Sequence, residues 1–149
     1  MLVKSLDELL NEAEKHDITV CIEGARPHTV STPEIMNKLL ERLKSEKLRV
    51  LFAPVNLITV NNHENQQELI KKSFEFFGDK ISVIHLKDFF IDNERILTTF
   101  PGGGSLDFEF LFERIEKYMP GLELIVEDIP SGTMDKTIKF IDTMVKRHN

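Results

Sequence analysis

The order of apolar segments along the chain is the strongest constraint on its fold. Four short apolar segments of strand length alternate with longer segments in which apolar residues recur at helical spacing. The predicted strands cover residues 18–23, 49–53, 81–86 and 122–127. Strands that alternate with helices usually form a parallel sheet through right-handed crossovers. We therefore expect a single α/β domain over residues 1–149.

Five helices are predicted around these strands, over residues 5–16, 33–45, 67–77, 107–118 and 134–147. Ser5 and Glu8 have the spacing of a capping box, which predicts that the first helix begins at Ser5. Thr32 is the expected N-cap of the second helix, with Pro33 at its first position. The chain should thus contain one helix followed by four strand–helix units.

The two faces of the predicted strands differ in polarity. Because side chains alternate along a strand, residues such as Val50, Phe52, Ile84 and Leu86 share one fully apolar face. The opposite face mixes apolar residues with charged ones. An open doubly wound sheet needs two apolar faces, whereas a barrel interior tolerates polar layers at its ends. The pattern therefore favours barrel geometry over a flavodoxin-like sheet.

Charge and composition exclude some classes of protein. The net charge is −6 and the basic residues form no block, which argues against nucleic-acid binding. The sequence has no apolar run of 18 residues and no signal-peptide pattern, so we expect no membrane association. With Cys21 alone, no disulfide can form within one chain, and a cytoplasmic location is expected. We predict that Cys21 is buried in its strand.

Polar residues stand at the ends of all four predicted strands. Glu23, His85 and Glu127 end three of them, and Asn56 follows the other. The carboxyl ends of parallel strands are where α/β folds bind ligands. Each of these residues alone has an ordinary explanation, since a glutamate can end a strand in solvent and a histidine can pack in a core. Four such strand ends together indicate a site for a metal or a sugar.

Several sequence motifs resemble one known family. They are Glu23, Thr32-Pro33-Glu34, the stretch 49–57 (RVLFAPVNL), the stretch 83–89 (VIHLKDF), the glycine loop 101–107 (PGGGSLD) and Ile125-Val126-Glu127. Together they resemble the sugar-phosphate isomerase/epimerase family, which has the xylose isomerase-like TIM barrel. Such a barrel needs about 250 residues. The resemblance therefore implies the C-terminal, parallel-stranded half of a TIM (β/α)8 barrel, with four βα units preceded by one helix.

The resemblance also implies a divalent metal, for which we expect manganese, with magnesium, cobalt or zinc as alternatives. The family holds its metal with Glu, Asp, His and Glu from four consecutive strand ends. Glu23, His85 and Glu127 match three of these ligands, but Ala53 occupies the position of the aspartate. Asn56 and Asp88 are the candidates to compensate for the missing carboxylate.

By the same resemblance, Glu23 and Glu127 are the catalytic residues. One would remove a proton next to a carbonyl of a small sugar or sugar phosphate, and the other would return it after an enediolate has formed. Because Ala53 departs from the family pattern, the alternative is a non-catalytic half-barrel, either a remnant or an interaction module. The DNA-repair endonucleases of the same superfamily use more strand-end histidines than this chain has.

Other residues are expected to contact the substrate. Asn56 and Lys87 lie near the predicted rim, and His28 follows the first strand. Backbone amides of Gly103 and Gly104 could bind a phosphate. Each has an alternative: His28 as a surface residue, Lys87 as a solvated lysine, and the glycines as a turn.

A half-barrel leaves two strand edges without partners. Open edges favour pairing with another chain. We therefore expect a homodimer, or contact with a separate partner half-barrel.

Overall fold

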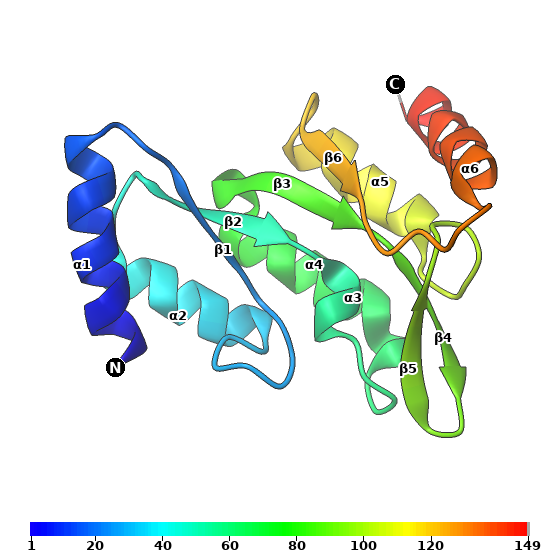
Figure 1. Cartoon of the computed structure of the whole chain (residues 1–149), viewed down its shortest axis with the longest axis horizontal. Helices are drawn as coiled ribbons and strands as arrows, with labels where there is room; N and C mark the ends of the chain where they lie inside the picture. Colours follow the sequence, from blue (N-terminus) through cyan, green and yellow to red (C-terminus); the bar gives the residue numbers. More distant parts are fainter. Residues whose placement is uncertain (149) are drawn as a thin grey trace.

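The chain forms one open, four-stranded parallel sheet with helices packed on it (Figure 1). The computed structural model describes residues 1–148. The strand order is β1 (Val20–Glu23), β2 (Leu48–Phe52), β3 (Ile81–Leu86) and β6 (Glu123–Val126). All three strand pairs are parallel, so the four carboxyl ends share one rim. The predicted succession of one helix and four strand–helix units is confirmed.

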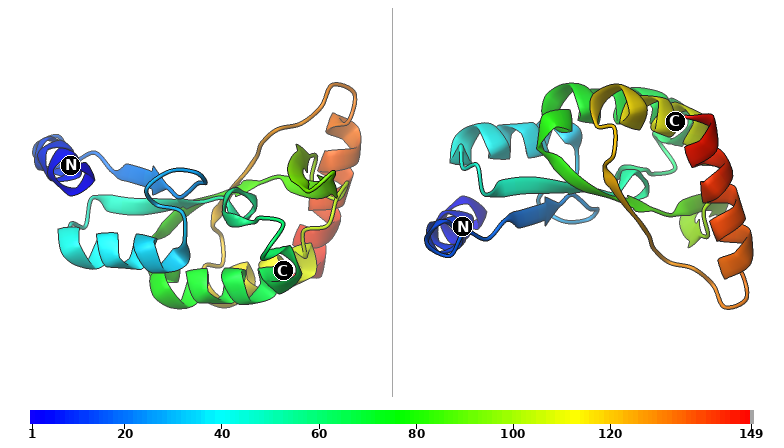
Figure 2. Two further views of the ribbon diagram at one scale, coloured as in Figure 1. Left: turned by 90° about the horizontal axis from the view of Figure 1, so that it is seen from below. Right: turned by 90° about the horizontal axis from the view of Figure 1, so that it is seen from above.

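Three helices cover one face of this sheet. They are α2 (Pro33–Leu43), α4 (Gln66–Phe77) and α5 (Phe108–Tyr118), whereas α1 (Leu2–Lys15) and α6 (Met134–Arg147) lie at the two far ends of the molecule (Figure 2). Shorter turns connect these elements: α3 (Pro54–Leu57), η1 (His63–Asn65) and η2 (Gly78–Lys80). No helix within residues 1–148 has the length and apolar character needed to cross a membrane.

The two predicted helix starts have different outcomes. The Thr32 hydroxyl accepts a hydrogen bond from the Ile35 amide at 3.3 Å, which confirms this N-cap. The predicted start at Ser5 is wrong, because α1 begins at Leu2. Leu2 and Val3 pack against the core, and this burial extends the helix past Ser5 toward the N-terminus. The Ser5 hydroxyl instead donates a hydrogen bond to the Met1 carbonyl.

The core lies between the sheet and the helices. Val50, Phe52, Ile84 and Leu86 on the covered face are each at most 2% exposed. The Phe52 ring meets those of Phe74 and Phe77 on α4 edge-on, with centroids 5.8 and 6.0 Å apart. This covered face is the apolar face predicted from the alternation.

The opposite, concave face is open. Leu51 and Val83 are only half-buried, and Ile125 is 47% exposed. Cys21 also lies here and is exposed, so the prediction that it is buried is wrong. That prediction rested on how often a free cysteine is buried, but Cys21 faces the side of the sheet that the helices leave uncovered (Figure 2).

An antiparallel hairpin interrupts the connection between β3 and α5. Its strands are β4 (Asp88–Asp92) and β5 (Arg95–Thr99). Asn93 and Glu94 at its tip both have left-handed backbone angles (φ 47° and 59°), as a two-residue turn between such strands requires. The sequence analysis predicted a long loop here and missed this hairpin.

Candidate metal and catalytic site

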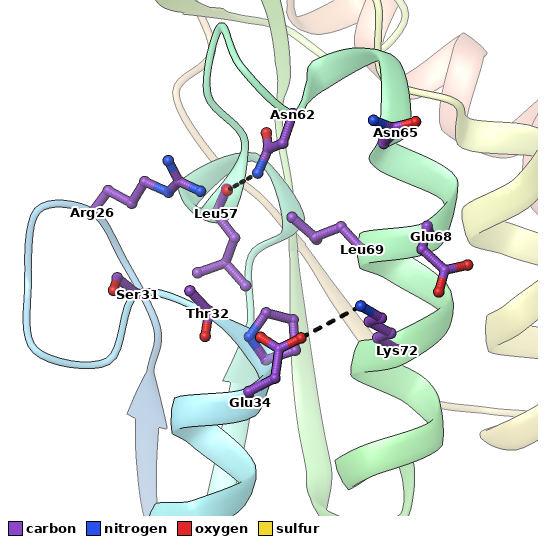
Figure 3. Close-up of a pocket in the computed structure, with 11 residues that line it drawn as sticks. Arg26, Ser31, Thr32, Glu34, Leu57, Asn62, Asn65, Glu68, Leu69 and Lys72 are labelled. Atoms are coloured by element: carbon purple, nitrogen blue, oxygen red, sulfur yellow. Dashed lines mark hydrogen bonds and ion pairs between the residues drawn. The ribbon is translucent and has the colours of Figure 1, made fainter.

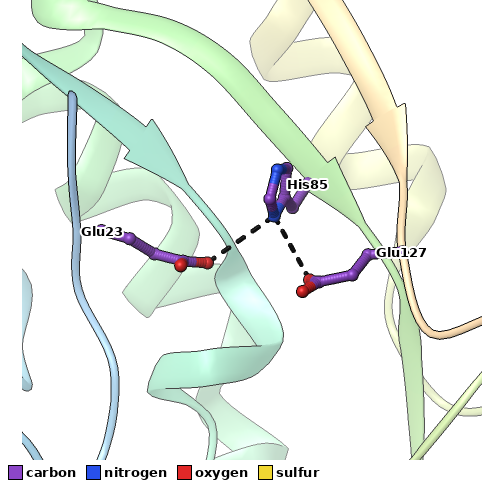
Figure 4. Close-up of side chains that lie close together, drawn as sticks. All are labelled: Glu23, His85 and Glu127. Atoms are coloured by element: carbon purple, nitrogen blue, oxygen red, sulfur yellow. Dashed lines mark ion pairs between the residues drawn. The ribbon is translucent and has the colours of Figure 1, made fainter. Parts of the chain in front are cut away.

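Three of the predicted residues meet at the rim formed by the strand ends. Glu23 ends β1, His85 lies near the end of β3, and Glu127 directly follows β6 (Figure 4). One side-chain ligand atom from each lies within 4.8 Å of the others. His85 Nδ1 is 3.7 Å from Glu23 Oε1 and 3.3 Å from Glu127 Oε2. The parallel register thus brings together side chains that are 104 residues apart at the extremes (127 − 23).

The donor atoms of this cluster fit a divalent cation. Within residues 1–148, His85 Nδ1 is buried without a hydrogen bond. Buried polar atoms are normally satisfied, so this orphaned nitrogen needs a partner. Two carboxylates and one imidazole are a ligand set that manganese, zinc and related ions accept.

Glu23 has a neutral neighbour. The Asn56 side-chain amide donates a hydrogen bond to Glu23 Oε1 at 2.9 Å. Asn56 lies on α3, the single helical turn that follows β2. A backbone hydrogen bond from the Arg26 amide to the Asn56 carbonyl, at 3.1 Å, ties this turn to the loop after β1. Asn56 therefore holds the Glu23 carboxylate in position.

Ala53, at the end of β2, occupies the position where the resemblance implies a fourth metal ligand. It follows β2 and precedes α3, and it is 2% exposed. Its methyl group offers no donor atom. The cluster is therefore a three-residue set within the part of the chain that the structure describes.

Glu127 has a charged neighbour. Lys87 Nζ lies 2.9 Å from Glu127 Oε2 and 3.4 Å from Asp128 Oδ2, and the lysine side chain is 7% exposed. Burial of this ammonium lowers its pKa, but the hydrogen bond and charge of Glu127, together with Asp128, raise it by more, so the pKa of Lys87 is raised overall. Lys87 is thus neither a solvated lysine nor free to reach a substrate without leaving Glu127.

Asp128 is a site residue that the sequence analysis missed. Its backbone is left-handed, with φ 54°. This angle interrupts the strand alternation that would place Asp128 and Glu127 on opposite sides. Aspartate tolerates the left-handed region better than most residues, which is the only sequence signal for such a turn.

Asp88 does not compensate for the missing ligand. Its buried carboxylate accepts hydrogen bonds from the amides of Phe89, Gly102, Gly104 and Leu106, at 2.7 to 3.1 Å. Burial raises the pKa of this carboxyl, although the four amides act in the opposite direction. The prediction that Asp88 could serve the metal is wrong, because its acceptor positions are used to hold the glycine loop.

The glycine loop is shaped by this anchor. A side chain at Gly104 would collide with the Phe89 carbonyl oxygen, and Gly102 has φ +83°. The Gly104 amide donates to Asp88 at 2.8 Å, and the Gly103 amide donates to the Phe100 carbonyl at 2.9 Å. Both amides thus have internal partners, and phosphate binding by this loop stays a prediction.

His28 is not part of the cluster formed by Glu23, His85 and Glu127. It is exposed in the loop after β1, where its backbone amide donates to the Ala25 carbonyl at 2.9 Å. Within residues 1–148 its ring makes no hydrogen bond or ion pair in the structure. A contact between His28 and substrate stays a prediction.

A pocket of about 210 Å³ lies away from this cluster, beside the loop after β1 (Figure 3). It opens between that loop, the start of α2 and α4, and the Glu34–Lys72 ion pair (3.6 Å) spans two of its walls. Arg26 and Glu68 also line it, so its charges are mixed. None of the predicted site residues is among its lining residues in the described chain.

A comparison with protein families gives one match over nearly the whole chain. Residues 1–144 match the family described as "Xylose isomerase-like TIM barrel". No protein with a curated description matches the sequence.

Solved structures give the same fold. The xylose isomerase domain protein from Planctomyces limnophilus superposes with a TM-score of 0.80 at 16% identity, over 98% of this chain and 51% of that one. A D-tagatose 3-epimerase-like protein gives 0.74 at 19% identity, over 99% and 54%. The IOLI protein, solved with a zinc atom, gives 0.71 at 18% identity, over 99% and 56%. This chain therefore spans about half the length of these proteins, and its fold is that of half a TIM barrel.

Proposed function

Because the chain belongs to the xylose isomerase-like TIM barrel family, we propose that it acts in the metal-dependent isomerisation or epimerisation of a small sugar or sugar phosphate. The observation that carries this proposal is the convergence of Glu23, His85 and Glu127 within 4.8 Å at the carboxyl rim. Structural neighbours named as epimerases support the class of reaction.

Glu23, His85 and Glu127 would hold the metal, for which we propose manganese. The zinc atom in the IOLI structure and the magnesium in a related barrel from Mycobacterium smegmatis support a divalent ion of this type. When bound, such an ion polarises the oxygens of the sugar and stabilises negative charge on them. The buried, unpartnered Nδ1 of His85 is the atom most in need of this ligand.

The two glutamates would transfer the proton. Their carboxylates come from the two edge strands and approach the same space from opposite sides (Figure 4). A base on one side of a carbon and an acid on the other can remove and return a proton with inversion at that carbon. Asn56 would hold the Glu23 carboxylate in position.

One observation favours the alternative, a non-catalytic half-barrel. Ala53 replaces a carboxylate, and losing an anionic ligand should weaken metal binding. The chain would then use its open face for interaction alone.

A metal titration separates these two functions. If the site works, manganese should raise the melting temperature of the protein, and Glu127→Gln should remove most of this gain. Glu123→Gln on the same strand is the matched control and should keep the gain. Ala53→Asp should enlarge it by restoring an anionic ligand. If millimolar manganese leaves the melting temperature unchanged, the non-catalytic alternative is favoured.

Chemistry can be tested independently of binding. With manganese and a panel of ketoses in D₂O, proton exchange at the carbon next to the carbonyl can be followed by NMR. We expect exchange with the wild type and none with Glu23→Gln or Glu127→Gln. Exchange that persists in both variants would contradict their proposed role.

We also propose that four further strands cover the open edges of β1 and β6, from a second copy or from a separate half-barrel chain. The exposed Ile125 and Cys21 on the concave face support this. Light scattering coupled to gel filtration tests the homodimer. A well-folded monomer at micromolar concentration would argue against it.

A further inference from the structure

We propose that Lys87 is the residue that sets the metal affinity of this site, because its ammonium occupies the carboxylate oxygen that a divalent ion must bind. This inference rests on the proposed function. According to our inference, Lys87 and the metal ion cannot both bind Glu127, and binding of the metal moves Lys87 onto Asp128.

One oxygen atom carries the argument. Glu127 Oε2 is the carboxylate atom nearest His85 Nδ1, at 3.3 Å, so it faces the centre of the cluster. The same atom lies 2.9 Å from Lys87 Nζ. Two cations close to one oxygen repel each other strongly in a partly buried site. An ion held by His85 and Glu127 therefore requires the ammonium to withdraw.

Lys87 is held where this competition is strong. It follows His85 by two residues, so both side chains leave the same side of the strand end. Its side chain is 7% exposed, which limits the water available to screen its charge. A backbone hydrogen bond from the Glu127 amide to the Leu86 carbonyl, at 3.0 Å, fixes the two strand ends against each other.

Asp128 offers the ammonium a second position. Its Oδ2 lies 3.4 Å from Lys87 Nζ, already within reach but farther than Glu127. The carboxylate of Asp128 could therefore accept the lysine without returning it to water. At Glu23 the situation differs, because its partner is the neutral Asn56 amide.

Calorimetric titration with Mn²⁺ alone tests the inference. Lys87→Met should bind manganese roughly ten- to a hundredfold more tightly than wild type, the size of effect that outer partners of metal ligands have. Lys80→Met is the matched control: Lys80 precedes the other end of β3, pairs with Glu46 at 3.0 Å, and should leave the affinity unchanged. Circular dichroism and the melting temperature without metal confirm that each variant is folded, and Lys87→Gln repeats the test if Lys87→Met is not.

A double-mutant cycle tests the role of Asp128. Asp128→Asn should weaken manganese binding in the wild type by more than in the Lys87→Met background, because only the former needs the second position for the lysine. Equal losses in both backgrounds would show that Asp128 acts only through its own charge, and would overturn the proposed movement of Lys87.

The titrations separate the failure of this inference from that of the proposed function. If wild type and Lys87→Met bind manganese equally, the metal site stands and the inference is overturned. If only Lys87→Met binds, the inference is supported and the metal-dependent function of the wild type is not. If neither binds, both are overturned.

Discussion

The two faces of the same four strands have opposite surroundings. On the convex face, Val50, Phe52, Ile84 and Leu86 are sealed under α2, α4 and α5. On the concave face, Leu51 and Val83 are half-buried and Ile125 is open. Strand alternation thus assigns every second residue to stability and leaves the others for the site and for a partner. The difference teaches that the fold can hold its rim in place without using the residues that face the site.

The largest loss of folding stability is expected from a substitution on the convex face. Phe52→Ala should lower the free energy of unfolding by about 3–5 kcal/mol, because it leaves a cavity beside Phe74 and Phe77. In the monomeric chain, the adjacent Leu51→Ala, on the concave face, should cost about 1 kcal/mol or less, because its side chain is only half-buried. Urea unfolding of the two variants, at a concentration where light scattering shows a monomer, measures both. Equal losses in the monomer would contradict the comparison.

An intermediate effect is expected at the rim. Asp88→Ala should cost roughly 2–4 kcal/mol, because it leaves buried amides of the glycine loop without an acceptor. Hydrogen exchange should show faster exchange of the Gly102, Gly104 and Leu106 amides. Asp92→Ala, exposed on the same hairpin strand, is the control. Unchanged exchange at these three amides would show that Asp88 does not hold the loop.

The smallest effect is expected on the outer surface of the helix layer. A hydrogen bond with its own backbone amide, one with Thr32 and the charge of Lys72 lower the pKa of Glu34 below its ordinary value of 4.5. Its ionised form therefore stabilises the fold above pH 4.5, and this contribution is lost as the pH falls through the lowered pKa. Glu34→Gln should cost less than about 1 kcal/mol at pH 7.

Urea unfolding of wild type and Glu34→Gln at several pH values tests this sign. The difference between them should shrink toward zero below pH 4.5. A difference that grows as the pH falls would show that the pKa of Glu34 is raised in the folded protein.

Much of the fold could be predicted from the sequence because periodicity reports burial. The helices α2, α4, α5 and α6 fall where apolar spacing placed them, with ends within two residues. The hairpin was missed although its signals are present. Phe89-Phe90-Ile91 and Ile96-Leu97 flank Asn93 and Glu94, but a polar turn without glycine gives a weaker hairpin signal than Asn-Gly.

The site could be predicted in part. Strand ends identified where Glu23, His85 and Glu127 would meet, since parallel register brings such ends to one rim. Asn56 and Lys87 were also predicted at this rim, but their contacts with Glu23 and Glu127 were not. Asp128 was missed because its position depends on a left-handed backbone angle. Burial of Cys21 was mispredicted because the general tendency of free cysteines to be buried does not tell which face of a sheet is covered.

The hairpin β4–β5 has a practical consequence for following the molecule in solution. Its tip, with Asn93 and Glu94, is exposed and projects beyond the sheet, while its base is fixed through Asp88 (Figure 1). A fluorophore or short peptide tag attached between these two tip residues would be carried on the hairpin beside the rim formed by the strand ends. Such a reporter would sense whatever docks there, without altering a single residue of the barrel itself.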